Sequence, residues 1–249
     1  MTNPIFLSAL ALSAVSALPM DAATVAVGAA GYTQNFDSLV AGTAPATGWS
    51  VRTGATETGM GTAQSMSVTA RDWTNAGGSF KNASSTNIAE TSTAQEQLEN
   101  TDRALAVTQT TFGNYDPGAA FSFNFSTTGV VLNTISIDML VLKENTRTSS
   151  FEIQYGLGTT PASFTTLATW SSGGFGGTDF TFDDSDFGTA LDGQEQVWFR
   201  VVALDATTGT GTPDMVGIDD FSINASAVPE PSAVVLLSAL GVLGLVRRR

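Results

Sequence analysis

The chain has 249 residues, which is enough for one domain of about 200 residues between two terminal signals. It has no cysteine and no histidine, which excludes disulfides, thiolate metal sites and the usual general base of Ser-His and Cys-His catalysis. Its formal net charge of −13 disfavours nucleic acid and anionic lipid as partners, and it favours cations or neutral polymers.

The N-terminus, residues 1–23, is predicted to be a secretory signal peptide. A short apolar stretch from Ile5 to Leu18 is followed by small residues before polar sequence begins. The residues before this stretch include no Lys or Arg, so their only positive charge is the terminal amine. Cleavage after Ala17 and cleavage after Ala22 both fit the pattern of small residues, and the exported domain is expected to span residues 24–227.

From Tyr32 onward, short runs of Val, Ile, Phe and Thr alternate with turns of Gly, Asn, Asp and Ser, which predicts an all-β domain. The clearest strand is 133–142, where apolar and polar residues alternate. The segment 196–202 is apolar on both faces, which predicts a central strand. Further strands are predicted at residues 104–110, 119–125, 150–155, 167–170, 179–182 and 216–223.

The predicted strand 216–223 contains a break in its two-residue period. Its apolar residues are even-numbered up to Ile218 and odd-numbered from Phe221 onward, and the shift falls at Asp219 and Asp220. Because a one-residue slip would turn half of the apolar set outward, we predict a β-bulge at the two aspartates. The weaker pattern of residues 54–99 predicts long loops and short edge strands, with one helical turn at 95–100.

Roughly ten strands in one domain predict two antiparallel sheets packed face to face in a jelly-roll or lectin-like sandwich. No repeat of fixed period is found along the chain, which argues against a propeller or a solenoid. An immunoglobulin-like sandwich, or a pair of them, is the alternative architecture.

Two groups of aspartates are candidates for calcium, because hard cations bind carboxylate and loop carbonyl oxygens. Asp184 and Asp186 lie in a Gly-rich region, although their spacing does not match an EF-hand and a solvated turn is the simpler interpretation. Asp219 and Asp220 form the second group, with Asp37 as partner, because lectin-like jelly rolls often hold calcium between the first and last strands. The alternative is that one bulge aspartate accepts hydrogen bonds from loop amides while the other faces water.

Two further features concern carbohydrate. Trp73 lies in a polar loop context, which makes it the predicted exposed platform for stacking against a sugar, although core packing is the commoner fate of tryptophan. Paired carboxylates could also cleave a glycosidic bond. No Glu lies in a recognisable catalytic context on a strand, so a polysaccharide hydrolase or lyase is the alternative to a non-catalytic protein.

The C-terminal segment, residues 228–249, joins a Pro-Glu-Pro triplet to an apolar run and a basic end. The prolines hold the chain extended, so the fold should end before them. The apolar run 233–246 spans roughly 21 Å as a helix, which is short of a hydrocarbon core about 30 Å thick. Terminal arginines prefer the cytoplasmic side, which leaves the bulk of the chain outside the cytoplasm. The residues of the triplet and of the basic end are Pro229, Glu230, Pro231, Arg247, Arg248 and Arg249.

This order of motif, short transmembrane helix and basic stop resembles the PEP-CTERM sorting signal of exported bacterial proteins. The resemblance implies recognition by an exosortase at the inner membrane, a membrane-anchored intermediate, and removal of the tail near the motif. It further implies a final place at the cell surface or in the extracellular matrix of bacteria that make extracellular polysaccharide. The resemblance implies a route of export and does not imply any biochemical activity.

The rest of the chain looks like a common ectodomain of PEP-CTERM proteins, for which no catalytic residues are implied. The pieces that carry this resemblance are Asn-Phe-Asp-Ser-Leu at 35–39, Trp49, Arg-Ala-Leu at 103–105, Ala-Leu-Asp-Gly at 190–193, Val-Trp-Phe-Arg at 197–200 and Gly-Ile-Asp-Asp-Phe at 217–221. The resulting hypothesis is an exported, non-catalytic surface or matrix protein that associates with extracellular polysaccharide.

Overall fold

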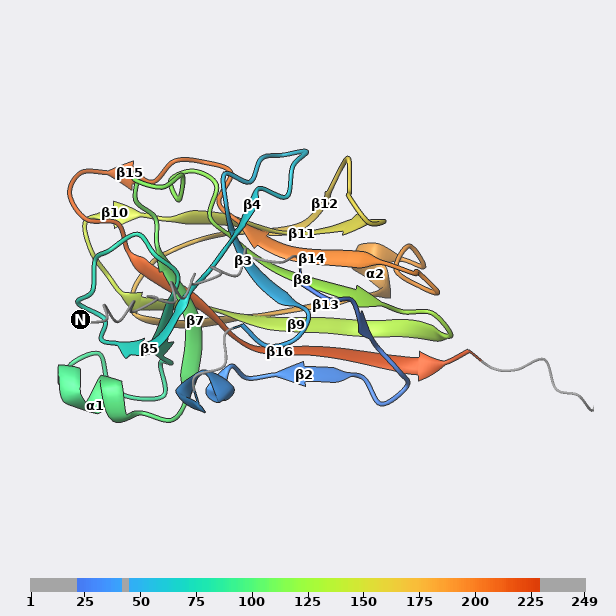
Figure 1. Cartoon of the computed structure of the whole chain (residues 1–249), viewed down its shortest axis with the longest axis horizontal. Helices are drawn as coiled ribbons and strands as arrows, with labels where there is room; N and C mark the ends of the chain where they lie inside the picture. Colours follow the sequence, from blue (N-terminus) through green and yellow to red (C-terminus); the bar gives the residue numbers. More distant parts are fainter. Residues whose placement is uncertain (1–21, 42–44, 229–249) are drawn as a thin grey trace, which may run out of the picture.

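The computed structural model describes residues 22–41 and 45–228, which form two sheets packed face to face (Figure 1). The predicted two-sheet antiparallel jelly-roll sandwich is confirmed. The predicted signal helix, the triplet Pro229 to Pro231 and the transmembrane helix with its terminal arginines lie outside the described residues. Within those residues, no helix combines the length and apolar character that crossing a membrane requires.

The first sheet, sheet I, has seven strands in the order β12-β11-β14-β8-β3-β4, and β1 pairs in parallel with β8. Its central strand is the one expected from its apolar residues on both faces, since β14 lies between β11 and β8. The strands are β1 (Val25–Ala26), β3 (Trp49–Thr53), β4 (Thr62–Gln64), β8 (Ala120–Ser126), β11 (Ser150–Leu157), β12 (Thr165–Ser171) and β14 (Val197–Val202).

The second sheet, sheet II, also has seven strands, in the order β13-β9-β16-β7-β6-β5, and β2 pairs with β16. Its strands are β2 (Tyr32–Gln34), β5 (Ser67–Arg71), β6 (Lys81–Ser84), β7 (Arg103–Thr108), β9 (Val130–Lys143), β13 (Gly176–Asp183) and β16 (Met215–Ala227). The remaining elements are η1 (Asp37–Ala41), α1 (Ala94–Glu99), α2 (Asp184–Phe187) and the short pair β10 (Arg147–Thr148) and β15 (Thr208–Gly209).

The predicted β-bulge in the last strand is confirmed. The pairing of β16 with β9 shifts register between Asp219 and Ser222. Asp220 has a φ of 44°, a left-handed conformation that costs a non-glycine residue free energy. The bulge keeps Ile218 and Phe221 in the core although their sequence numbers differ in parity.

An aromatic cluster joins the two sheets in the core. Phe123 on β8 lies with its ring centroid 5.1 Å from that of Phe221 on β16, and Trp49 on β3 lies 5.0 Å from Phe221. Each of these side chains is at most 3% exposed. Burial of one such side chain stabilises a fold by roughly 1.5–3 kcal/mol, so these contacts are a main source of cohesion between the sheets.

The expectation of short edge strands within residues 54–99 is wrong for β6, which lies inside sheet II between β5 and β7. Its sequence lacks apolar alternation, yet all four residues are buried. Hydrogen bonds explain this burial, because Asn82 donates to the carbonyl oxygens of Val68 and Leu39 and accepts from Arg103 Nε at 2.6 Å. Polar side chains with partners can occupy the interior of a sheet.

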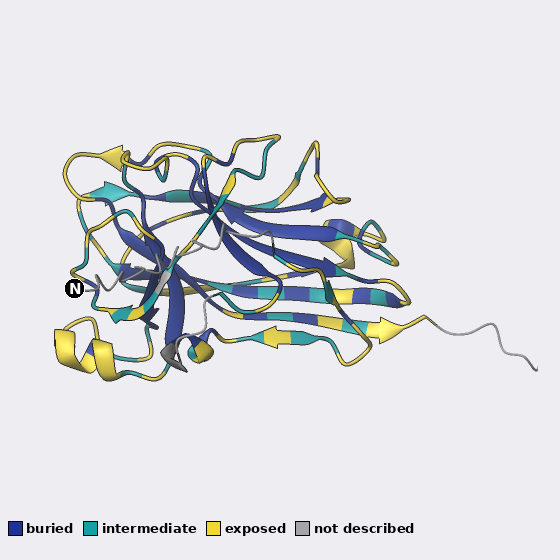
Figure 2. Ribbon diagram, viewed as in Figure 1, coloured by how far each residue is buried: buried dark blue, intermediate teal, exposed yellow. Residues whose placement is uncertain are grey.

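Several strands are buried along their whole length, as the continuous dark blue of β3, β7 and β14 in Figure 2 illustrates. A strand in a bare two-layer sandwich would expose every second residue to solvent. The outer faces of both sheets are therefore covered over these strands, and the chemistry of these covered parts distinguishes sheet I from sheet II.

Candidate functional site

The outer face of sheet I is polar and buried. Residues next to one another along a strand point to opposite faces, so the neighbours of core residues such as Phe121 and Val201 point outward. Seven of these outward residues are at most 6% exposed, and we call them the polar floor. They are Ser50 and Arg52 on β3, Ser122 and Asn124 on β8, Gln154 on β11, and Trp198 and Arg200 on β14.

Arg200 fixes one loop over the middle of the polar floor. Its Nε donates to Gln154 Oε1 at 2.8 Å, and its terminal nitrogens donate to the carbonyl oxygens of Gly59 and Thr56, each at 3.0 Å. Its guanidinium also lies 3.3 Å from the ring centroid of Phe164. Burial lowers the pKa of Arg200 to about 10, so the side chain is still charged at neutral pH.

Arg52 and Trp198 fix two loops at one end of the floor. The Arg52 guanidinium lies 5.0 Å from the ring centroid of Trp198, in a cation–π contact, and it donates to the carbonyl oxygen of Gly61 at 3.3 Å. Trp198 Nε1 donates to the carbonyl oxygen of Thr159 at 3.3 Å. The segments 59–63 and 159–160 are thereby held on either side of an open space.

This space is a hollow of about 520 Å³, which we call the Trp198 hollow. Its lining combines hydroxyl groups, one guanidinium and small apolar surfaces, and it includes no carboxylate. The lining residues are Arg52, Met60, Gly61, Thr62, Ala63, Thr159, Thr160 and Trp198.

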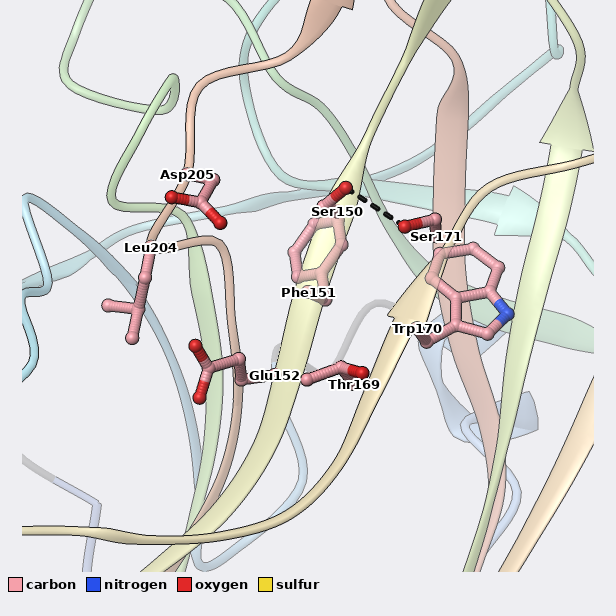
Figure 3. A pocket seen from close by; sticks show the side chains of 8 residues that line it. All are labelled: Ser150, Phe151, Glu152, Thr169, Trp170, Ser171, Leu204 and Asp205. Carbon is pink, nitrogen blue, oxygen red and sulfur yellow. Dashed lines mark hydrogen bonds between the residues drawn. The ribbon is translucent and has the colours of Figure 1, made fainter.

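A second, smaller hollow of about 160 Å³ lies on the other side of Arg200, and we call it the Glu152 hollow (Figure 3). The strand register gives its position, since Gln154 pairs with Arg200 while Glu152 pairs with Val202, two residues further along β14. Its lining residues are Ser150, Phe151, Glu152, Thr169, Trp170, Ser171, Leu204 and Asp205.

Two polar atoms of the floor are buried without a hydrogen-bond partner among the described residues. They are Ser122 Oγ and Asn124 Oδ1, both on β8. Buried polar atoms without any partner are rare in folded proteins, and such atoms usually contact water or a ligand. The polar floor therefore has hydrogen-bonding capacity that the described residues do not use.

The prediction that Trp73 is an exposed platform is wrong, because this side chain is 2% exposed. Its Nε1 donates to the carbonyl oxygen of Ser84 at 3.0 Å, and its backbone amide donates to Gln97 Oε1 at 2.7 Å. The ring covers the outer face of sheet II, where it packs with Leu140 and Leu142. Its polar neighbours in sequence gave no indication of this apolar surface.

The aspartates at 183–186 form the N-terminus of the short helix α2. Asp183 accepts a hydrogen bond from the amide of Ser185 at 2.8 Å, and Asp186 accepts one from the amide of Asp183 at 2.9 Å. This reciprocal arrangement is a capping box. The carboxylates of Asp183 and Asp186 thus have a local structural role, and Asp184 lies in the first turn of the helix.

The structure brings Asp37 and the bulge aspartates into one acidic region. Asp37 accepts a hydrogen bond from the amide of Arg103 at 2.9 Å, and Asp219 accepts bonds from Ser85 Oγ at 2.6 Å and from the amide of Asp220 at 2.8 Å. Burial raises the pKa of Asp219 to about 8. The arrangement fits the alternative predicted for the bulge, in which one aspartate accepts from an amide and the other, Asp220, is exposed.

Asp102 is a member of this region that sequence analysis missed. Burial raises its pKa, and the negative charges of Asp37 and Asp220 raise it further. The residue precedes β7 in an unremarkable turn sequence, so no pattern indicated its position. The first and last strands of sheet II, β2 and β16, pair next to this region.

Calcium binding stays a prediction from the sequence. In the parts of the chain that the structure describes, no group of three or more acidic residues is arranged to hold a metal ion. If calcium binds with useful affinity, millimolar calcium is expected to raise the melting temperature and a chelator to reverse the rise. An unchanged melting temperature in a calorimetric scan would count against the prediction.

The sequence did not lead us to the residues of the polar floor either, although one of its features could have indicated them. Arg200 lies in a strand that is otherwise apolar on both faces, and a buried arginine requires several acceptors. The acceptors come from Thr56 and Gly59, which are more than 140 residues away in the sequence. Their position depends on the tertiary fold.

Comparison with known proteins gives one family match and several structural similarities. The model of the PEP-CTERM protein-sorting motif matches residues 227–249, whereas no curated protein matches the chain. The chain thus carries this sorting signal, and it is exported to the cell surface through a membrane-anchored intermediate.

Three similar solved structures represent two kinds of domain. The C-terminal family 22 carbohydrate binding module of Clostridium thermocellum Xyn10B has 10% identity and a TM-score of 0.41, over 80% of this chain and 96% of that one. The CBM22-1 xylan-binding domain of Paenibacillus barcinonensis Xyn10C has 11% identity and a TM-score of 0.42, over 83% and 100%. The K2 cleaved adhesin domain of Lys-gingipain has 13% identity and a TM-score of 0.44, over 78% and 98%. Such values are too low to transfer a ligand or an activity.

Proposed function

We propose that this chain is an exported, non-catalytic polysaccharide-binding protein of the bacterial surface or matrix, and that the Trp198 hollow holds the glycan. The observation that carries the proposal is the open hollow itself. It lies on a polar floor, between two loops that Arg52 and Trp198 hold in place.

The lining of the Trp198 hollow suits the chemistry of a sugar. Hydroxyl groups of a sugar both donate and accept hydrogen bonds, and Thr62, Thr159 and Thr160 offer hydroxyls that do the same. The C–H faces of a sugar are apolar, and Met60 and Ala63 offer apolar surface. Because the loops are already hydrogen-bonded in place, binding would order few side chains, which reduces its entropic cost.

A binding role fits this hollow better than hydrolysis. Glycoside hydrolysis ordinarily requires two carboxyl groups on either side of the scissile bond, and no carboxylate lines the Trp198 hollow. Asp219 is 3% exposed and bonded to Ser85, which leaves it poorly suited to act on a polymer. The Glu152 hollow has two carboxylates in its lining, and release of reducing sugar that Glu152→Gln abolishes would support the hydrolase or lyase alternative.

The sorting motif supports the compartment in which this binding would take place. We propose that an exosortase recognises Pro229 to Pro231 at the inner membrane and that the sandwich then reaches a matrix rich in polysaccharide. The strongly acidic composition is compatible with a neutral or cationic polymer there.

Isothermal titration of the full chain with xylohexaose, cellohexaose and laminarihexaose tests the proposal. At least one of these neutral ligands is expected to bind, and the double variant Thr62→Val, Thr160→Val is expected to weaken binding roughly tenfold through the loss of two hydrogen bonds. Both threonines are exposed, so their replacement should leave the fold intact.

The matched control is Thr181→Val, which makes the same chemical change at an exposed position of β13 in sheet II. It is expected to bind as the natural chain does. Equal weakening by the control and the double variant would contradict the placement of the site. Absence of binding to every neutral glycan tested would leave a structural matrix component as the better description.

A further inference from the structure

The Glu152 hollow differs from the Trp198 hollow in its charge. Two of its eight lining residues are carboxylates, and none is Lys or Arg. Figure 3 shows the carboxylates of Glu152 and Asp205 on the same side of the hollow, with Leu204 beside them. The site therefore combines a negative charge with a confined volume.

Neighbouring groups satisfy these carboxylates only in part. Glu152 Oε2 accepts from Gln154 Nε2 at 2.8 Å and from Thr166 Oγ1 at 2.7 Å, and Glu152 also interacts electrostatically with Arg200. The hydrogen bonds of the Arg200 guanidinium run to Gln154 and to loop carbonyl oxygens. Asp205 makes no hydrogen bond or ion pair with any other described residue. One arginine against two carboxylates leaves the hollow acidic.

The other residues that line the Glu152 hollow indicate what kind of ligand would fit. Ser150, Ser171 and Thr169 offer hydroxyl groups around the opening, and Ser150 Oγ lies 3.0 Å from Ser171 Oγ. Leu204 adds apolar surface. The hollow of about 160 Å³ is smaller than the Trp198 hollow of about 520 Å³, which favours a small occupant such as a single sugar residue.

We propose that the Glu152 hollow binds a sugar residue that carries a primary ammonium group. The ammonium would lie between the carboxylates of Glu152 and Asp205, and the ring hydroxyls would bond to the serine and threonine hydroxyls. This inference rests on the proposed function and narrows it to polysaccharides that contain amino sugars. Acidic sugars are disfavoured at this site, because their carboxylates would face those of the protein.

Titration of the full chain with the hexamer of β-1,4-linked glucosamine and with its fully N-acetylated counterpart tests the inference. The two ligands share ring and linkage, and they differ in the charge on nitrogen. The glucosamine hexamer is expected to bind roughly tenfold more tightly at low salt, and Asp205→Asn and Glu152→Gln are each expected to remove most of this preference.

The matched control is Glu90→Gln, which removes one negative charge at an exposed loop position outside the hollow. It is expected to keep the preference, whereas an equal loss would show that the acidic surface as a whole attracts the amine. Equal affinity for the two hexamers would also overturn the inference. If the amine ligand binds through Asp205 while no neutral hexasaccharide binds, the Trp198 hollow fails as a site and this inference stands.

Discussion

Replacement of Asp219 by asparagine is expected to stabilise the protein at pH 8 and to change its stability little near pH 4. The pKa of Asp219 is raised to about 8 in the folded protein, mainly by burial, against about 3.9 for an unfolded chain. The folded state therefore binds more protons than the unfolded state between these values. The contribution of Asp219 to the free energy of unfolding is therefore fully present below about pH 4. It decreases as the pH rises toward 8, by at most roughly 1.4 kcal/mol per pH unit.

An asparagine at position 219 can make similar hydrogen bonds to those of the neutral aspartic acid, but it has no proton to lose as the pH rises. Its Oδ1 can accept from the amide of Asp220, as Asp219 Oδ1 does, and its Nδ2 can donate to Ser85 Oγ. The difference in free energy of unfolding between variant and natural chain should thus grow to several kcal/mol at pH 8. Asp138, whose pKa is raised to about 6, contributes a pH dependence to both proteins.

Urea unfolding at several pH values between 4 and 8 measures this difference. The control is Asp220→Asn, which makes the same change at the exposed neighbour and is expected to change the slope with pH much less, because Asp220 affects the pKa of Asp219 only through its charge and burial is the larger cause. Parallel pH profiles for the natural chain and Asp219→Asn would contradict the proposed burial of a protonated carboxyl group.

The second large effect is expected at Arg103, where replacement by methionine should cost roughly 3–5 kcal/mol of stability, since each buried acceptor left unpaired costs about 1–3 kcal/mol. Arg103 is fully buried and donates from Nε to Asn82 Oδ1 and from its terminal nitrogens to three carbonyl oxygens, those of Gln97, Asn100 and Asn82. These bonds attach the C-terminal end of α1 to β6. Methionine fills part of the volume and leaves the acceptors unpaired.

Arg71→Met is the matched control, because it makes the same change at an exposed position. Equilibrium unfolding in urea is expected to give a loss below about 1 kcal/mol for this control. An equally small loss for Arg103→Met would mean that the buried hydrogen bonds of Arg103 contribute little net stability.

The strands of the core could be predicted from the sequence because their side chains obey a simple period. Alternation identified β9 and β11, and the change of phase at Asp219 identified the bulge. The sorting tail could also be recognised from the sequence, since its order of triplet, apolar run and arginines is a linear motif.

The covered outer faces could not be predicted in this way. Trp73 was predicted to be exposed from its polar neighbours in sequence, yet it is buried, and Lys81 is buried as well. Lys81 is fully buried, it donates to Thr108 and Gly77, and burial lowers its pKa to about 8. The polar floor likewise depends on loops that cross sheet I, so its burial is a property of the tertiary structure.

Hydrogen–deuterium exchange of the full chain, with and without the tightest-binding neutral hexasaccharide, tests the central claim most directly. A glycan in the Trp198 hollow is expected to slow exchange of the backbone amides in residues 59–63 and 158–164, which flank the hollow, and to leave β6 and β16 unchanged. Slower exchange confined to sheet II or to the acidic region at Asp219, with binding intact and these loops unaffected, would contradict the assignment of glycan binding to the outer face of sheet I.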